Sequence, residues 1–171
     1  MPTARLDAIL HLRGGGTSVV VDTRGERLPR IAHWGPDLGV LAPESLAALV
    51  DAQAPQRVSG GTDQTAPFSL LPEQSQGWLG TPGLTGHRDG ADFSVALAVT
   101  GLRLDPGDAP RLVVQARDGV AGVAVTLELE VTASGLVRQR ATVRNDGAGR
   151  FELTGVLATF PVPGPPPSCS T

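Results

Sequence analysis

The fold of this chain is constrained most by an alternation of apolar and polar side chains within residues 120–132. Alanine, threonine and glutamate alternate with apolar side chains at every second position. The apolar positions are Val123, Val125, Leu127, Leu129 and Val131. A period of two is typical of a β-strand with one buried face and one solvent-facing side. The pattern therefore predicts a half-buried strand in an antiparallel sheet.

The next segment, residues 136–144, alternates in the same way after a turn at residues 132–135. A hairpin at this turn would place Glu128 and Glu130 opposite Arg138 and Arg140. Opposite charges on facing strands attract one another. The two segments therefore predict a hairpin that carries a cross-strand charge ladder.

Further extended segments and turn signals occur along the rest of the chain. Strands are predicted at residues 5–13, 17–22, 27–34, 93–104, 110–117 and 151–160. One short helix is predicted at residues 43–52, where Pro43 suits the first helical position and Glu44 the positive end of the helix dipole. About eight to ten strands with one helix predict a mainly β fold, an antiparallel β-sandwich over residues 1–160. Residues 161–171 are predicted to be a proline-rich, disordered tail.

The composition excludes several functional classes. All 14 basic residues are arginine against 17 acidic residues, and a net charge of −3 gives no drive toward nucleic acid or an anionic membrane. The absence of lysine excludes lysine-based chemistry, and the single Cys169 excludes an internal disulfide. His11, His33 and His87 lack the spacing of metal ligands, so no metal or cofactor is expected. No apolar segment near the N-terminus is long enough to be a signal peptide, so a cytoplasmic location is expected.

Residues 53–92 lose regular periodicity over about forty positions, and loops of this length are usually functional or disordered. Apolar residues are spread through the segment, which favours a loop packed on another part of the protein. Trp78 lies among glutamine, histidine, arginine and glycine, a combination that suits the stacking and hydrogen bonding of a sugar ring. The alternative interpretation is a packed loop with a structural tryptophan. None of the acids stands in an apolar context that would raise its pKa, so no acid–base pair is singled out.

Three segments carry a family resemblance: RIAHWGPDLG at residues 30–39, SLLPEQSQGWLGTPGLTGHRDG at 69–90 and LVRQRATVRNDG at 136–147. They resemble the N-terminal domain of actinobacterial α-galactosidases of glycoside hydrolase family 36, from about residue 6 to residue 163. The resemblance implies a β-supersandwich of the galactose-mutarotase type ahead of a catalytic (β/α)₈ barrel. It also implies that the full-length enzyme hydrolyses terminal α-galactose residues with retention of configuration.

The two catalytic aspartates of that family lie in the barrel, in motifs that resemble Lys-Trp-Asp and a segment after Ser-Gly-Gly-Gly-Gly-Arg. Neither motif exists in this sequence, so no catalytic residue is assigned and the chain is expected to be inactive alone. The resemblance stops after Phe160, which predicts a truncated or frame-shifted end. From the family, a loop of this domain reaches a substrate pocket, which makes Trp78, His87 and Arg88 the candidate sugar contacts.

The expected partners are α-galactosides, through the full-length enzyme, and a second copy of the chain in a homo-oligomer. Neither nucleic acid nor a membrane is expected as a partner. The alternative functions are a stand-alone carbohydrate-binding module and an oligomerisation module that buries the 53–92 segment.

Overall fold

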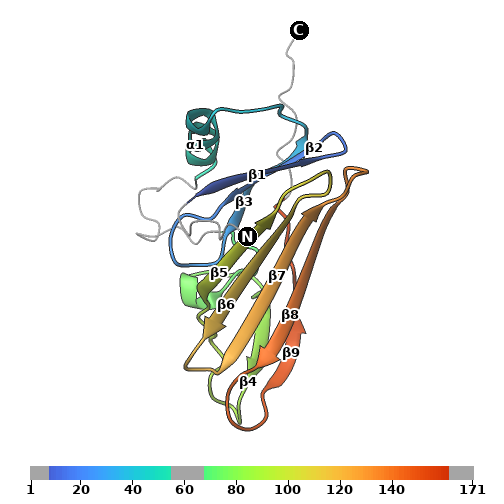
Figure 1. Ribbon diagram of the computed structural model, residues 1–171. Helices are drawn as coiled ribbons and strands as arrows, with labels where there is room; N and C mark the ends of the chain where they lie inside the picture. The colour runs from blue at the N-terminus through green and yellow to red at the C-terminus, as the bar shows by residue number, and fades with distance from the viewer. Residues whose placement is uncertain (1–7, 55–67, 162–171) are drawn as a thin grey trace, which may run out of the picture.

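The computed structural model describes residues 8–54 and 68–161, which form an antiparallel β-sandwich with one α-helix among the described residues (Figure 1). The strands form a three-stranded sheet in the order β1-β2-β3, a two-stranded sheet β4-β9 and a four-stranded sheet β5-β6-β7-β8. The elements are β1 Ile9–Gly14, β2 Thr17–Asp22, β3 Arg30–Pro36, α1 Pro43–Ala52, the 3₁₀ turn η1 Gln74–Gln76, β4 Leu84–His87, β5 Ala98–Asp105, β6 Arg111–Asp118, β7 Val123–Val131, β8 Val137–Asn145 and β9 Glu152–Val156. The predicted fold class is confirmed.

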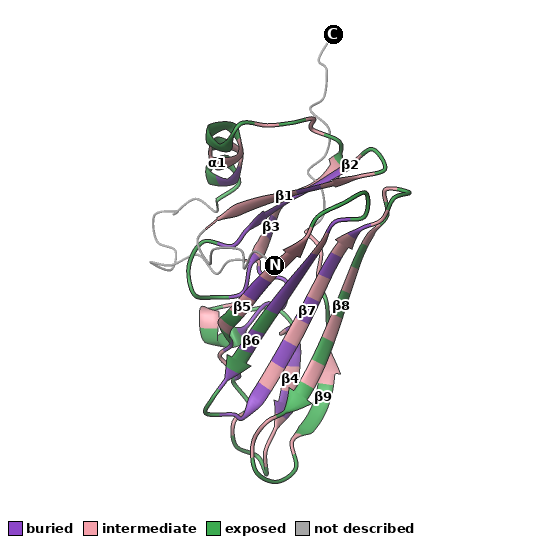
Figure 2. Cartoon of the chain, viewed as in Figure 1, coloured by how far each residue is buried: buried purple, intermediate pink, exposed green. Residues whose placement is uncertain are grey.

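The alternation along β7 is the centre of the fold. Its inward side chains are at most 2% exposed, whereas the residues between them are half-buried, and the stripes on β7 in Figure 2 show this alternation. The buried side chains of β7 join one apolar cluster with Leu12 of β1, Leu84 of β4 and Leu112 of β6. One core therefore connects all three sheets.

Strand β2 is buried on both of its faces, because the helix covers the side that does not face the four-stranded sheet (Figure 1). Val19 and Val21 join the main core, while Val20 is fully buried outside that cluster, as is Val50 of α1. The helix has the bounds that the sequence predicts. A second layer over β1–β3 explains why β2 is a continuous apolar run instead of an alternating one.

The described part of the irregular 53–92 segment is packed on the core, as predicted. Leu70 and Leu71 are 1% and 0% exposed, and Leu70 N–H bonds the carbonyl of Pro29. Strand β4 in this segment was not predicted. It pairs with β9, and the register shifts between Thr85 and Gly86. The short, glycine-interrupted strand gave no periodic signal.

Several strand boundaries differ from the prediction. The predicted strand at 27–34 is observed at Arg30–Pro36, and Pro29 precedes it, where a missing N–H interrupts no ladder. The predicted strand at 93–104 begins only at Ala98. The tail predicted at 161–171 lies outside the described residues except for Pro161.

Candidate functional site

Trp78 follows η1 on a glycine-rich loop and is partly exposed. Its ring meets Phe68 edge-on with centroids 5.3 Å apart, and its indole N–H donates to the carbonyl of Thr81 at 3.0 Å. Gly80 lies beneath the ring, where a Cβ would approach the indole to 2.9 Å. The neighbouring Leu79 is 94% exposed. The loop therefore presents an aromatic ring and an aliphatic side chain at the surface.

His87 is the last residue of β4 and is partly exposed. Its Nε2 lies 3.4 Å from a carboxylate oxygen of Glu152 on β9, and its Nδ1 accepts a 3.3 Å hydrogen bond from the Gly90 N–H. Both ring nitrogens therefore have partners within the chain.

Arg88 follows directly and joins two loops at the end of the sandwich. Its two terminal nitrogens donate four hydrogen bonds of 2.6–3.0 Å, to the carbonyls of Ala121, Ala148 and Gly149 and to the side chain of Asn145. The guanidinium also lies 5.6 Å from the centroid of the Phe151 ring. These contacts occupy the four terminal N–H groups, so the side chain holds the loop before β9 in place.

His87 and Arg88 are sequence neighbours, but neither forms a hydrogen bond, an ion pair or a ring contact with Trp78 among the described residues. Trp78 contacts Phe68 and Thr81, whereas the other two contact β9 and the turns at the far end of β4. No bonded interaction therefore joins the three candidate sugar contacts within this part of the chain.

Glu73 is a buried titratable group that was not among the predicted site residues. It is only 5% exposed, Oε1 accepts a 2.6 Å hydrogen bond from Leu97 N–H, and Oε2 is buried without a partner in the described structure. Burial raises its pKa to about 7, against the lowering effects of the Leu97 hydrogen bond and of the Arg27 charge. The expectation that no acid has a raised pKa is therefore wrong. The apolar run Leu70–Pro72 just before it is the signal that could have found it.

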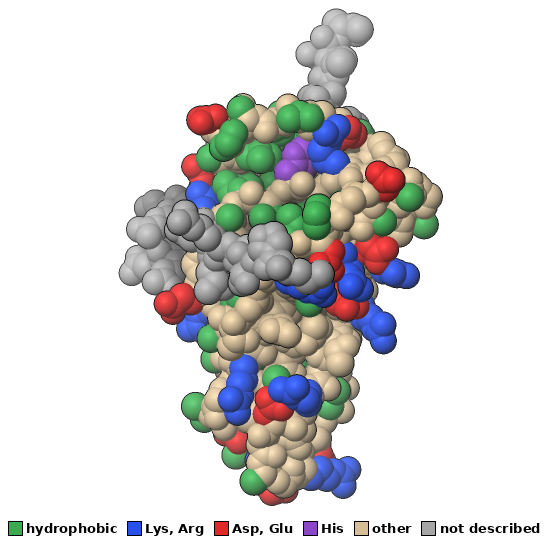
Figure 3. Space-filling view, in the orientation of Figure 1, with side chains coloured by type: hydrophobic (Ala, Val, Ile, Leu, Met, Phe, Trp, Pro, Cys, Tyr) green, Lys and Arg blue, Asp and Glu red, His purple; other side chains and the backbone are tan. Residues whose placement is uncertain are grey.

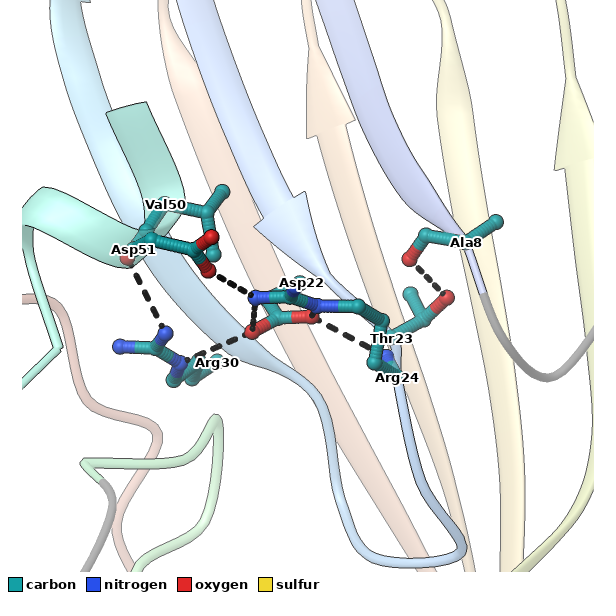
Figure 4. Close-up of polar contacts among 7 residues, drawn as sticks. All are labelled: Ala8, Asp22, Thr23, Arg24, Arg30, Val50 and Asp51. Carbon is teal, nitrogen blue, oxygen red and sulfur yellow. Dashed lines mark hydrogen bonds and ion pairs between the residues drawn. The ribbon is translucent and has the colours of Figure 1, made fainter. Parts of the chain in front are cut away.

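A cluster of ion pairs lies where α1 meets β2 (Figure 4). The buried carboxylate of Asp22 pairs with Arg24 at 2.9 Å and with Arg30 at 3.1 Å. Arg24 also reaches Asp51 on the helix, and Arg30 donates to the carbonyl of Val50. Burial alone would raise the pKa of Asp22, but the Arg24 hydrogen bonds and the Arg30 charge outweigh it, so the pKa is lowered. A permanently ionised, arginine-bound carboxylate cannot act as a general acid at neutral pH, so this cluster fastens the helix to the sheet.

Serine, histidine and aspartate also lie together at the start of β2, the residue types of a nucleophilic triad. Ser18 Oγ lies 2.8 Å from both His11 Nε2 and Asp37 Oδ1, and Arg13 forms a bidentate pair with the same aspartate. In a triad the histidine lies between the other two, whereas here the serine does. Ser18 is also fully buried and accepts the Leu38 N–H. The cluster therefore fixes the chain after β3, and its serine hydroxyl is closed off from the surface.

Residues 8–54 and 68–161 contain neither a metal cluster nor a membrane-spanning helix. No group of three or more His, Cys, Asp and Glu side chains could hold a metal ion there. No helix in the same part of the chain is long and apolar enough to cross a membrane.

Comparison with known proteins gives one consistent family. Residues 27–166 match the glycosyl hydrolase family 36 N-terminal domain. An α-galactosidase of Escherichia coli is 30% identical over 132 residues, which are 77% of this chain and 18% of that protein. The chain therefore spans less than a fifth of this relative.

Solved structures agree in fold. The family 36 α-galactosidase AgaA of Geobacillus stearothermophilus superposes with a TM-score of 0.67 at 18% identity, over 88% of this chain and 24% of that one. The α-galactosidase of Lactobacillus brevis gives 0.71 at 14% identity, over 92% of this chain and 24% of that one. With most of its length matched by the family model, this chain belongs to the glycosyl hydrolase family 36 N-terminal domain family.

Proposed function

We propose that this chain is an N-terminal part of an α-galactosidase, an enzyme that removes terminal α-linked galactose from α-galactosides. The observation that carries the proposal is the family match over residues 27–166, which includes strands β3 to β9 and the Trp78 loop. The hydrolytic chemistry, with retention of configuration, belongs in this proposal to a barrel domain outside the chain.

The proposal implies that this chain alone is inactive, and the chemistry of the described carboxylates supports this. Glycoside hydrolysis needs two carboxyl groups on either side of the bond that breaks, one of them protonated. Glu73 has the raised pKa of such an acid, but it is buried against Leu97. Asp22, Asp37 and Asp146 are held ionised by arginines, because hydrogen bonds from Arg24, Arg13 and Arg144 lower their pKa values.

Nitrophenol release from a nitrophenyl α-galactoside tests this assignment. We expect none from the purified chain, and hydrolysis from the same chain fused to, or mixed with, a family 36 barrel. Glu73→Gln is the matched control for the isolated chain, because it removes the one carboxyl group with an acid's pKa among those described. Hydrolysis by the isolated chain that this variant abolishes would overturn the proposal.

Within the assembled enzyme, we assign the sugar contact to Trp78 before His87 or Arg88. Its ring is partly exposed, and its N–H is held by Thr81, so the ring has a fixed orientation for stacking. The side chains of Arg88 and His87 form hydrogen bonds within this chain and support the surrounding loops. In a full-length enzyme, Trp78→Ala is expected to raise KM for raffinose several-fold, whereas His87→Ala leaves KM within about twofold.

A stand-alone carbohydrate-binding module is the second candidate function, and the partly exposed Trp78 beside the exposed Leu79 favours it. It predicts saturable binding of galactose to the isolated chain, lost in Trp78→Ala and kept in Leu79→Ala. Titration calorimetry without heat at millimolar galactose would exclude it.

An oligomerisation module would instead bury Trp78 and Leu79 against a second copy of the chain. It predicts a mass above that of a monomer by light scattering, and a monomer mass for Leu79→Ser.

Three narrower expectations stay predictions. An actinobacterial source is supported by the resemblance of residues 69–90 and by arginine at every basic position. The truncated end is tested by the DNA that follows the codon for Thr171, where a barrel in another frame would support it. The cytoplasmic location is tested by fractionation of the source cells.

A further inference from the structure

The core of the sandwich is closed under β7 but open under its neighbour β8. The inward side chains of β7 are at most 2% exposed. The equivalent positions of β8 are all half-buried: Val137, Gln139, Ala141 and Val143. The three apolar side chains among them pack against the same cluster. Burial therefore falls off abruptly at the last strand of the four-stranded sheet, as the colours of β7 and β8 show in Figure 2.

Apolar surface continues along this open side. Leu136 before β8 is 68% exposed, and Leu153 of β9 and Leu157 after it are 47% and 50% exposed. A hollow of about 340 Å³ at one end of β8 is lined by Trp34, Leu136, Val137 and Phe160. A second hollow, of about 190 Å³, lies at the other end beside Val143, Phe151 and Leu153. The apolar inner face of β8 thus has hollows at both ends.

The backbone of β8 has a free edge on the same side. Its only strand partner in the described structure is β7, and it is the outermost strand of its sheet (Figure 1). The N–H of Asp146 donates to Gly122 and the N–H of Thr132 to Leu136, which are opposite positions in the β7–β8 register. Because hydrogen-bonded pairs alternate in an antiparallel ladder, the even-numbered residues of β8 face β7. The N–H and C=O groups of Val137, Gln139, Ala141 and Val143 therefore point to the free edge.

The outer side chains of β8 set the charge of this edge. Arg138, Arg140 and Arg144 alternate with the inward apolar positions, and Figure 3 shows arginine side chains along this margin of the molecule. On the β7 side, Arg138 pairs with Glu130 at 2.5 Å, and Arg144 forms a bidentate pair with Asp146. Arg140 faces Glu128 across the ladder but has no ion pair among the described residues, because Glu128 pairs with Arg111 at 3.7 Å.

We propose that the free edge of β8 is a docking site for an extended strand from outside this chain, one that alternates apolar and acidic side chains. Its backbone pairs with the free groups of β8, which is how exposed sheet edges accept a partner. Its apolar side chains cover the open core between the two hollows, and one of its carboxylates lies beside Arg140, the arginine of β8 that has no ion pair among the described residues. Strand β7, with Leu127-Glu128-Leu129-Glu130, already meets β8 in this way on the other side. The buried Oε1 of Gln139, which has no described partner, gains a donor nearby.

Amide exchange of the intact chain at pH 7.5 tests the proposal, with a nine-residue peptide of alternating valine and glutamate as the probe. Without the peptide, the amides of Val137, Gln139, Ala141 and Val143 exchange fast, and those of Arg138, Arg140 and Thr142 exchange slowly. On saturation with the peptide, the fast set slows by about tenfold or more, because its N–H groups become paired. A matched peptide of alternating valine and lysine leaves that set fast.

The variant Ala141→Pro is the control in the protein, because it removes an N–H of the free edge and none of the β7 ladder. It should keep Arg140 and Thr142 slow, which shows that the sheet is intact, and lose the response to the peptide. Equal protection by the valine–lysine peptide would overturn the proposed charge selection. Slow exchange of the odd-numbered amides in the dilute chain alone would mean that the edge is already covered. Protection that grows with protein concentration and disappears in Ala141→Pro would assign the edge to a second copy, against the proposal. None of these results depends on galactosidase activity.

Discussion

Glu73 and Leu97 are joined by a 2.6 Å hydrogen bond from the backbone N–H of Leu97 to Oε1, inside the protein and 24 residues apart in sequence. The carbonyl of Glu73 also accepts the N–H groups of Gln76 and Trp78. One residue therefore connects the start of the Trp78 loop to the segment before β5. Because Oε2 is buried without a described partner, the neutral carboxyl is favoured over the carboxylate.

This geometry predicts that stability falls as the pH rises from about 4.5 to about 7, through the titration of Glu73. Folding raises its pKa, so the folded state binds more protons than the unfolded state in this range. The contribution is fully present below the unfolded pKa and is lost as the pH passes the folded value. Urea unfolding of the wild type at pH 5 and pH 8 measures the difference.

The variant Glu73→Gln isolates the effect, because it cannot titrate. His11 has a lowered pKa, caused first by burial, and opposes the trend equally in both proteins. The unfolding free energy of the wild type relative to that of Glu73→Gln should therefore be lower at pH 8 than at pH 5. Curves that stay parallel from pH 5 to pH 8 would show that Glu73 does not titrate in this range.

The burial of Glu73 illustrates what the sequence could not show. Periodicity reports the two faces of one strand, and it correctly located β7, β8 and the helix. It does not report what a loop packs against, so Glu73 and the pairing of β4 with β9 depend on contacts between distant segments. The charge ladder shows the same limit. The register of the β7–β8 hairpin was predicted correctly, but Glu128 pairs with Arg111 on β6, which is outside that hairpin.

The candidate site was predictable only as far as residue type. Glycine, tryptophan and polar residues in one segment indicated a loop with sugar-binding chemistry. Whether a side chain is free to bind a sugar depends on its partners within the protein. Arg88 donates its four hydrogen bonds to acceptors 33 to 61 residues away in sequence. No local pattern carries that information.

Removal of Asp22 is expected to cost about 3 kcal/mol of unfolding free energy, because the remaining guanidinium of Arg30, whose side chain is only 18% exposed, loses its carboxylate. Asp51→Ala serves as the matched control. It breaks the other ion pair of Arg24 but is 66% exposed, so it should cost less than about 1 kcal/mol. Chemical denaturation of Asp22→Ala and Asp51→Ala measures both. Equal losses would mean that burial does not distinguish the two pairs.

Arg88→Ala is expected to lower the unfolding free energy by about 3 kcal/mol, since four hydrogen bonds are worth about 1 kcal/mol each before relaxation. Arg88→Lys should recover only part of this, because an ammonium group lacks the planar fork. The control is Arg150→Ala, whose side chain is 83% exposed and makes one 3.6 Å ion pair, with an expected change within about 0.5 kcal/mol. A neutral Arg88→Ala would contradict the structural role and return this residue to the sugar site.

The hairpin between β1 and β2 offers a pair of adjacent glycines with the same backbone handedness and different surroundings. Gly15 and Gly16 have φ of +53° and +79°. A Cβ on Gly15 would lie 2.1 Å from the backbone nitrogen of Gly135, whereas a Cβ on Gly16 meets nothing within 4 Å. Gly16→Ala should therefore cost only the left-handed backbone strain, about 1 kcal/mol.

Gly15→Ala must in addition separate two hairpin tips that the Thr17 hydroxyl joins to the carbonyl of Gly135 at 2.8 Å. We expect it to cost on the order of 2 kcal/mol more than Gly16→Ala, as for other substitutions that overpack a close contact. Thermal unfolding of the two variants measures the difference directly, because the backbone strain cancels in the comparison. Equal melting temperatures would mean that the two hairpin tips do not touch in solution.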